Sequence, residues 1–432
     1  MNRPHHPTTN RVPIRRRPSA GNDGGLRRKL ATILLSVSCL AASKPGHAAA
    51  VHLERTPDGG IQQQALVDPA GRVQVVYFKG SPAGGDLFIV SGQVATGAGK
   101  GKTQFTTPVR VNDRAGSAVA VGTIRGPQIA LGRNGRVHVV WNGSTPLPTA
   151  SYKGTPLWYT RSALTNSSSG APSPELEPQR DLMANSDFLD GGASVAADAR
   201  GKVYVMWHGS TPGNTKGEAG RGVFLARSDD DGSHFSGPRK VNPAPDGVCA
   251  CCGLKAGVDA LGNLFAWCRV AKENTHRDGV ILESRNCGET FETIGSDPWE
   301  TQSCPMSSAS ILSSASDGVG GGATTVVAWE TAGDIRFQQF SADGKTAPSA
   351  FVEVPGRGKL SRKHPSVAVN KDGIVLLCWA EGTAWQKGGD LAWQAFDREG
   401  RPTTAKGRAE GVAVWGLATV VALKDGSFLI LY

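Results

Sequence analysis

The stretch VAADARGKVYVMW (195–207) consists of a short apolar strand, a turn of Asp, Arg and Gly, and a second strand that ends in Trp. The same pattern returns at IALGRNGRVHVVW (129–141) and, with another turn, at VAVNKDGIVLLCW (367–379). Short runs rich in β-branched residues on either side of a Gly-containing turn predict a β-hairpin. A hairpin that recurs at intervals indicates a repeat architecture, which has to be settled before single residues are interpreted.

The hairpin occurs seven times, at a spacing of roughly 53 to 66 residues, which is typical of a solenoid or a propeller. The other copies are ALVDPAGRVQVVYF (65–78), GVDALGNLFAW (257–267), ILSSASDGVGGGATTVVAW (311–329) and VALKDGSFLILY (421–432). Further apolar runs follow, such as GVFLARS (222–228) and SGPRKVN (236–242), which we interpret as third and fourth strands. No long stretch has apolar residues at helical spacing. The sequence therefore predicts an all-β fold, a β-propeller of four-stranded blades with seven blades favoured over six.

The two ends of the chain have different predicted roles. Basic residues precede the apolar run 30–42, and Ala48-Ala49-Ala50 follows it, as in a secretory signal peptide. The run is too short for a permanent membrane span. We therefore expect residues 1–50 to be a leader and residues 51–432 to form a single exported propeller, periplasmic or extracellular. A twin-arginine signal at Arg27-Arg28 and a lipid attachment at Cys39 are the alternatives.

The leader also accounts for the basic pI. Residues 1–49 hold nine Lys and Arg and one Asp, so their net charge is 9 − 1 = +8, whereas the whole chain carries +10. The remaining +2 gives no indication of nucleic-acid binding. We expect a monomer without a membrane span, in which residues 51–56 add a strand to the final, incomplete repeat and close the ring.

Two segments point to a family. SDDDGSHF (228–235) closely resembles the Asp box of sialidases and other BNR-repeat propellers, and SRNCGETF (284–291) is a second copy with Asn in place of Asp. Gly, Asp and Asn in this pattern favour a tight hairpin turn. The resemblance implies a sialidase-like propeller that binds a glycan at its channel mouth. The Asp box itself is a structural turn on the opposite face.

In a propeller, the loops that enter the inner strands and those that leave the second strands surround one mouth. The resemblance to sialidases implies that an arginine clamp and paired carboxylates lie there, for charge-assisted binding and glycoside hydrolysis. The candidates are Arg125, Arg269, Arg362 and His208 for ligand binding, and Asp190, Glu330 and Glu381 for catalysis. No tyrosine stands where the family keeps its nucleophile, so exo-glycosidase activity stays open.

Cysteines are concentrated in one part of the chain. Cys249, Cys251, Cys252, Cys268 and Cys304 all map to loops or strand ends on the mouth face of neighbouring blades. In an exported protein, disulfides are the default, and the pairing cannot be deduced from spacing. No cofactor is then expected.

The alternative is a metal site of soft ligands for copper or zinc, formed by Cys251, Cys252, Cys304 and His364. The C-x-C-C spacing differs from the paired C-x-x-C of a standard zinc site. Three functions follow as hypotheses: a glycan-binding propeller with or without hydrolase activity, a metal-binding or redox propeller, and a non-enzymatic interaction scaffold.

Overall fold

A computed structural model describes residues 50–94, 102–163, 174–242, 247–273, 275–313, 324–341 and 350–432, without residues 357 and 359. Residues Ala48–Tyr432 form one compact unit. The expected leader, with Arg27, Arg28 and Cys39, lies outside the described residues. Within the described part of the chain, no helix is long and apolar enough to cross a membrane.

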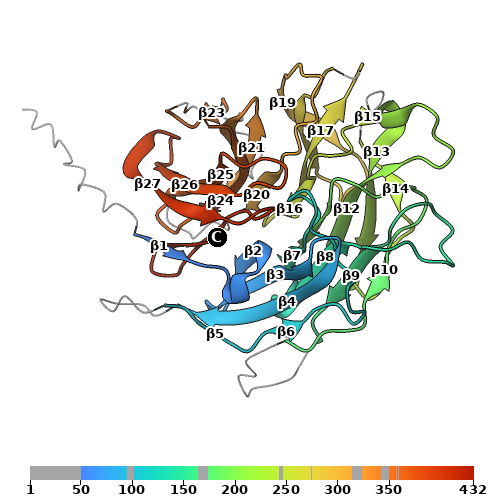
Figure 1. The fold of residues 1–432 in the computed structure, drawn as a ribbon, viewed down its shortest axis with the longest axis horizontal. Coiled ribbons are helices and arrows are strands. Elements are labelled where there is room, and N and C mark those ends of the chain that lie inside the picture. Colours follow the sequence, from blue (N-terminus) through green and yellow to red (C-terminus); the bar gives the residue numbers. More distant parts are fainter. Residues whose placement is uncertain are drawn as a thin grey trace, which may run out of the picture. The chain divides into compact units, whose positions relative to one another are not determined.

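The described strands form seven sheets, which follow one another in chain order around a central axis (Figure 1). The all-β, seven-bladed propeller is thus confirmed. Each of the first six sheets has four main strands ordered from the axis outwards, and the sheets of blades 1 and 4 have a fifth, short strand. Blade 1 consists of β2 (Ile61–Val67), β3 (Val73–Ser81), β4 (Gly84–Gln93) and β5 (Gln104–Phe105). Blade 2 consists of β7 (Gln128–Leu131), β8 (Val137–Asn142), β9 (Leu157–Arg161) and β10 (Arg180–Asp181). Blade 3 consists of β11 (Ala193–Ala197), β12 (Val203–Ser210), β13 (Arg221–Ser228) and β14 (Arg239–Lys240).

Blades 4 to 6 continue the same order. Blade 4 consists of β16 (Lys255–Val258), β17 (Leu264–Ala271), β18 (Gly279–Ser284) and β19 (Glu292–Asp297). Blade 5 consists of β20 (Ala309–Ser313), β21 (Thr324–Thr331), β22 (Asp334–Ser341) and β23 (Val352–Glu353). Blade 6 consists of β24 (Arg362–Val369), β25 (Val375–Glu381), β26 (Gly389–Phe396) and β27 (Pro402–Val412). Two short strands pair beside these, β6 (Val109–Arg110) with β4 and β15 (Gly247–Val248) with β17. The short 3-10 helices are η1 (Pro57–Gly59), η2 (Arg133–Gly135) and η3 (Gly217–Gly220).

The seventh blade joins the two ends of the propeller. Its strands β28 (Thr419–Ala422) and β29 (Phe428–Leu431) are antiparallel, and β1 (Val51–Glu54) pairs with β29 in parallel register. Thr56 N donates to Tyr432 O at 3.0 Å, and Tyr432 N donates to Glu54 O at 3.1 Å. The expected closing strand is therefore present, and this blade has three described strands.

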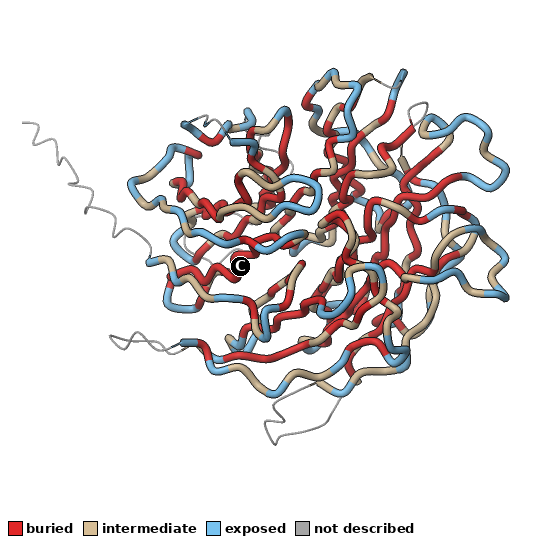
Figure 2. Tube along the Cα trace, viewed as in Figure 1, coloured by how far each residue is buried: buried red, intermediate tan, exposed pale blue. Residues whose placement is uncertain are grey.

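The core lies between neighbouring blades. Trp141, Trp207 and Trp267 are all buried, and each second strand continues beyond its Trp, which the sequence pattern placed at the strand end. Trp207 packs in one cluster with Val140 of blade 2 and Val195 of its own blade. Figure 2 shows burial along the strands and exposure in the connecting loops. Because each apolar cluster spans two sheets, a blade is stabilised mainly by its neighbours, as in other radial repeats.

The two Asp-box segments form matching turns. Ser228 Oγ accepts a hydrogen bond from Gly232 N at 2.9 Å, and Ser284 Oγ accepts one from Gly288 N at 2.8 Å. Both glycines have positive φ, +80° and +82°, which an L-residue adopts only with strain. Asp231, in the first turn, is buried and pairs with Arg136 of blade 2 at 2.7 Å. The turn thus also connects two blades.

Closure of the ring leads to a stability prediction. Deleting Ala50–Arg55 removes the β1 ladder, which has four register positions, and costs about 4 kcal/mol at about 1 kcal/mol net per hydrogen bond. The free energy of unfolding in urea measures the loss, with His52→Ala, an exposed position in the same strand, as the matched control. Equal stability of the deletion variant and the control would contradict closure by β1.

Candidate functional site at the channel mouth

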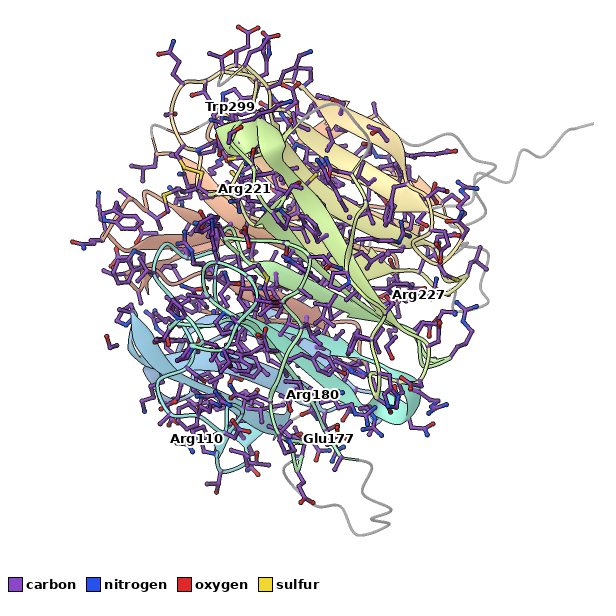
Figure 3. All side chains as sticks on the ribbon, turned by 90° about the vertical axis from the view of Figure 1, so that its right-hand side faces the viewer. Arg110, Glu177, Arg180, Arg221, Arg227 and Trp299 are labelled. Atoms are coloured by element: carbon purple, nitrogen blue, oxygen red, sulfur yellow. A yellow bond between two sulfur atoms is a disulfide. The ribbon has the colours of Figure 1, made fainter. Side chains whose placement is uncertain are left out.

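The inner strands run in one direction, so the ring has two unlike faces. One face, which we call the mouth face, carries the starts of the inner strands and the ends of the second strands. The other, the turn face, carries the hairpin turns that join them. Figure 3 follows β13 from Arg221 at the mouth face to Arg227 near the turn face. All seven candidates for ligand binding and catalysis lie at the mouth-face ends of their blades, as the repeat alignment predicts.

Arg125 and Asp190 form an ion pair across two blade connections. Arg125 Nη2 lies 2.5 Å from Asp190 Oδ1, and both side chains keep some exposure to solvent. Arg125 Nη1 also donates to Val121 O at 2.7 Å, and Asn142 Nδ2 donates to Asp190 O at 2.9 Å. These contacts fix a charged, partly accessible pair at the mouth.

Two further loops reach this pair. A Cβ placed on Gly122 would lie 2.8 Å from Arg125 Nη1, 3.0 Å from Met306 Cε and 3.6 Å from Trp385 Cζ3, so these three groups surround one point. Trp385 is 56% exposed, and its ring meets Trp415 edge-on with centroids 5.9 Å apart. Five connections, from blades 1, 2, 4 and 6, thus combine an exposed aromatic face with an ion pair.

A cleft of about 540 Å³ opens on the same face. Its walls include Trp299, Cys304, Pro305, Glu330 and Lys363. Lys363 Nζ donates to Pro305 O at 2.7 Å, which holds the two sides together. Met306, the residue after Pro305, lies at the same point beside Gly122 as Trp385. The cleft therefore adjoins the surface around Trp385.

Arg269 is fully buried beneath this cleft. Its guanidinium donates to Arg277 O at 2.6 Å and to Glu330 O at 2.5 Å. It also lies over two indole rings, 5.1 Å from the centroid of Trp267 and 4.8 Å from that of Trp299. Stacking between aromatic faces and donation to carbonyls hold this buried guanidinium without a ligand, and only its Nε lacks a hydrogen-bond partner among the described residues.

The three candidates in blades 5 and 6 are also held by contacts within the protein. Arg362 donates to Val354 O and Gly356 O, and its Nε lies 3.4 Å from Glu381 Oε1. Glu381 accepts a hydrogen bond from Trp379 Nε1 at 2.9 Å and pairs with Arg408. Glu330 Oε1 accepts from Gly333 N at 2.6 Å. Each of the candidate arginines and carboxylates therefore has its own set of protein partners.

The cysteines gather at blade 4, where the loop before its inner strand β16 meets the loop that leads on to blade 5. Cys251 and Cys304 form a disulfide, and Cys249 Sγ lies 3.4 Å from both Cys251 Sγ and Cys252 Sγ. Cys304 is exposed, whereas Cys249 and Cys252 are buried. The bridge between two mouth loops agrees with the disulfide expectation, and Cys268, Cys287 and Cys378 are free thiols.

Charged groups surround the buried thiols. Burial raises the pKa of Cys252, but the hydrogen bond from Cys249 and the charge of Arg269 outweigh it and bring the pKa to about 7. The hydrogen bond with Cys252 and burial raise the pKa of Cys249. Arg277 pairs with Glu218 at 2.6 Å and adds positive charge near both thiols. One thiolate in this group is therefore favoured over two.

The two candidate histidines, His208 and His364, are both buried. His208 has a pKa lowered to about 3 by burial and by the nearby Arg221. Burial and Lys363 lower the pKa of His364 to about 3, and its Nδ1 lies 3.1 Å from Ser308 Oγ. Both imidazoles are therefore neutral at neutral pH.

Sequence reasoning did not select three groups that the structure brings to these sites. Cys249 was noted among the mouth-face cysteines but was not included in the metal set, although its sulfur joins Cys251 to Cys252. Trp385 and Trp415 lie outside the hairpin repeat, in loops of no regular pattern. An aromatic residue in the loop after a second strand was the available signal for Trp385, and Trp415, in the connection to blade 7, had none.

Comparisons with known proteins concern the fold alone. No family model matches the chain, and no curated protein matches its sequence. Among solved structures, the chain is similar to a protein of unknown function from Dyadobacter fermentans (TM-score 0.49, 14% identity, covering 80% of this chain and 97% of that one). It is also similar to an α-L-arabinanase from Penicillium chrysogenum (0.49, 13%, 80% and 95%) and to a Hadza microbial sialidase (0.45, 16%, 78% and 68%).

The contacts of Arg269 lead to a prediction that separates a structural role from ligand binding. Arg269→Ala should lower the free energy of unfolding by about 3 kcal/mol, because two charged hydrogen bonds and two stacking contacts are lost. Arg269→Lys retains the charge but not the planar guanidinium, so its free energy of unfolding should lie between those of the wild type and Arg269→Ala. Urea unfolding measures both variants. Unchanged stability together with lost ligand binding would instead assign Arg269 to a ligand clamp.

Proposed function

We propose that the protein is a binding propeller that takes a glycan, or a ligand of similar chemistry, on its mouth face. The observation that supports this most strongly is the exposed indole of Trp385 next to the Arg125–Asp190 pair. Sugar rings offer apolar C–H faces that pack on an aromatic ring and hydroxyls that need polar partners. A single large aromatic surface with a few fixed polar groups meets both needs.

The polar part of the site can hold either a neutral or an acidic sugar. Asp190 offers carboxylate oxygens to hydroxyl donors, and Arg125 offers N–H donors to hydroxyl or carboxylate oxygens. The adjoining cleft with Trp299 and Lys363 extends the surface and adds a second cation. A ligand of more than one sugar unit therefore fits this arrangement better than a single ring.

We propose binding rather than hydrolysis. Asp190, Glu330 and Glu381 are each engaged by a different partner: Arg125 of another connection for Asp190, and groups of the same loop or strand for the two glutamates. A glycosidase needs two carboxyl groups that face one bond across a sugar. The Cys251–Cys304 disulfide is compatible with an oxidising, extracytoplasmic environment, and we propose that the protein is exported to it.

The Trp385 surface can be tested directly. A glycan array should show binding by the wild-type protein, and Trp385→Ala should weaken the strongest interaction at least tenfold, which corresponds to about 1.4 kcal/mol. Trp385→Phe should retain most of the affinity because it keeps an aromatic face. Leu261→Ala, an equally exposed apolar residue in a hairpin turn, is the control.

Two outcomes would contradict this function. An array without any bound glycan would reject the ligand class, and unaltered binding by Trp385→Ala would reject the site. A fluorogenic sialoside assay on the same preparation separates binding from catalysis. Our proposal predicts no turnover there.

A second candidate function rests on the sulfur cluster. Cys249, Cys251 and Cys252 have ligand atoms within 4.8 Å of one another, and Cys304 is bonded to Cys251. After reduction of the bridge, four sulfurs surround one region, and thiolates are suited to Cu(I) or Zn²⁺. His364, at Ser308, stays a proposed additional ligand. We propose this site for the reduced protein only, because the disulfide occupies two of the four sulfurs.

Metal analysis under two redox conditions tests this candidate. Protein reduced with a phosphine and supplied with Zn²⁺ should retain about one equivalent after desalting, and the oxidised protein should retain none. Cys249→Ser should abolish retention, whereas Cys378→Ser, a buried free thiol in blade 6, should not. Equal retention by Cys249→Ser and the wild type would contradict the cluster as the site.

A further inference from the structure

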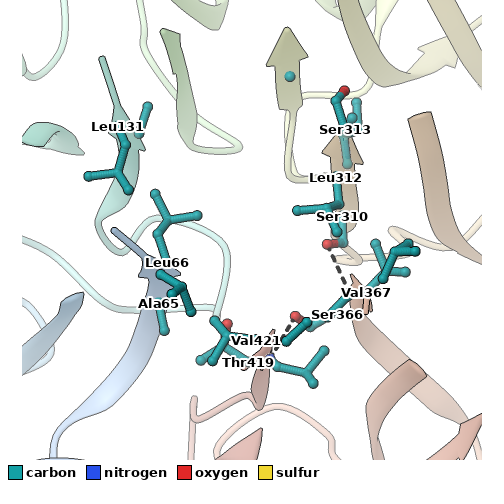
Figure 4. A pocket seen from close by; sticks show the side chains of 18 of the residues that line it. Ala65, Leu66, Leu131, Ser310, Leu312, Ser313, Ser366, Val367, Thr419 and Val421 are labelled. Atoms are coloured by element: carbon teal, nitrogen blue, oxygen red, sulfur yellow. Dashed lines mark hydrogen bonds between the residues drawn. The ribbon is translucent and has the colours of Figure 1, made fainter. Parts of the chain in front are cut away.

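The central channel is a cavity of about 1180 Å³. It is lined by the inner strands β2, β7, β11, β16, β20, β24 and β28 of all seven blades. Figure 4 shows side chains such as Leu66, Leu131, Leu312 and Val421 around the open space. Ser310 and Ser366 accept hydrogen bonds from Val367 N and Val420 N of the next blade, so their hydroxyls are used within the wall.

One lysine reaches across this channel. Lys255 is the first residue of β16, at the mouth-face end of blade 4. Its Nζ lies 2.6 Å from Gln128 Oε1 of blade 2 and 3.2 Å from Gln64 Oε1 of blade 1. The side chain thus extends from one side of the ring towards the other, and its ammonium faces the cavity that Lys255 helps to line.

The ammonium has no counter-ion in the described part of the chain. Its two recorded partners are neutral amide oxygens, which leaves one of its three N–H donors without a described acceptor. The other charged residues of the channel lining, Lys371, Asp372 and Arg398, belong to the turn face, at the opposite end. An ammonium that burial removes from water and that has no counter-ion is unfavourable, and an anion bound beside it removes that cost.

We propose that the channel is a binding site for a small organic carboxylate, whose head group pairs with Lys255 and whose apolar body lies along the channel wall. A carboxylate accepts the free N–H donor and supplies the missing negative charge. The wall residues between the two ends, among them Val67, Val258 and Ile311, offer apolar surface for a short hydrocarbon chain. This site is separate from the mouth-face site and does not depend on it.

The protonation of Lys255 supports the same conclusion. Burial lowers the pKa of Lys255 to about 8, and Gln64 and Gln128, which contact the ammonium, do not titrate. The lysine is therefore mainly charged at pH 7 and mainly neutral at pH 9.5. Carboxylate binding should be strong below the pKa and weaken as the pH rises through it.

Isothermal titration calorimetry with octanoate tests the site, with octanol as the uncharged probe. Wild-type protein should bind one octanoate at pH 7, and Lys255→Met should weaken binding at least tenfold while affecting octanol less than threefold. Lys371→Met, at the far end of the channel, is the matched control and should bind octanoate like the wild type. Raising the pH from 7 to 9.5 should weaken octanoate binding by the wild type and not by Lys255→Met.

The proposal can be tested even without the Lys255→Met variant. If Lys255→Met does not fold, the pH series on wild-type protein still decides, because loss of octanoate affinity above pH 8 requires a titrating cation at the site. The proposal is overturned if wild-type protein shows no one-to-one binding of octanoate, or if Lys255→Met binds it as tightly as the wild type. An affinity that is independent of pH between 7 and 9.5 would also overturn it.

Discussion

Every site in this protein depends on the closure of the ring. β1 comes from the N-terminal side of the propeller and β29 from its last residues, and their parallel ladder fixes blade 7 between blades 6 and 1. The glutamines of β2 extend this junction, since Gln63 Nε2 donates to Leu417 O and Leu431 O of the last repeat. Gln62 contacts Ala120 O and Gly126 N, in the connection that carries Arg125. Closure therefore sets the positions of both the channel and the mouth.

The same junction connects the two proposed binding sites physically but keeps them chemically distinct. Gln64, next to Gln63, contacts Lys255 at the mouth-face end of the channel, whereas Arg125 and Trp385 lie in the loops above it. The mouth-face site combines an exposed indole with an ion pair and suits a polar ligand. The channel combines apolar side chains of its inner strands with a cation, Lys255, that has no described counter-ion, and it suits an amphipathic anion. The sulfur cluster occupies a third position, where the loops before and after blade 4 meet.

The fold could be predicted from the sequence because its signal is repeated. Seven copies of one hairpin, each with turn residues at the same place, outweigh the uncertainty in any single copy. The mouth-face position of Arg125, Asp190 and the cysteines followed from the alignment of these copies. The partners of each side chain did not, because they come from loops without a pattern: the stacking of Arg269 on Trp299 and the approach of Trp385 to Arg125 depend on tertiary packing. Lys255 could not be predicted, because a single Lys at the start of a strand is ordinarily interpreted as a solvent-exposed residue.

The central claim is that ligands bind at the mouth face through Trp385 and its neighbouring loops. Hydrogen–deuterium exchange with and without the strongest-binding array glycan tests it most directly. The account predicts slower exchange in the connections 119–127, 298–308 and 382–388, with no change in the hairpin turns 198–201 and 370–373. Protection confined to the turn face, or no protection at all at a saturating glycan concentration, would contradict it.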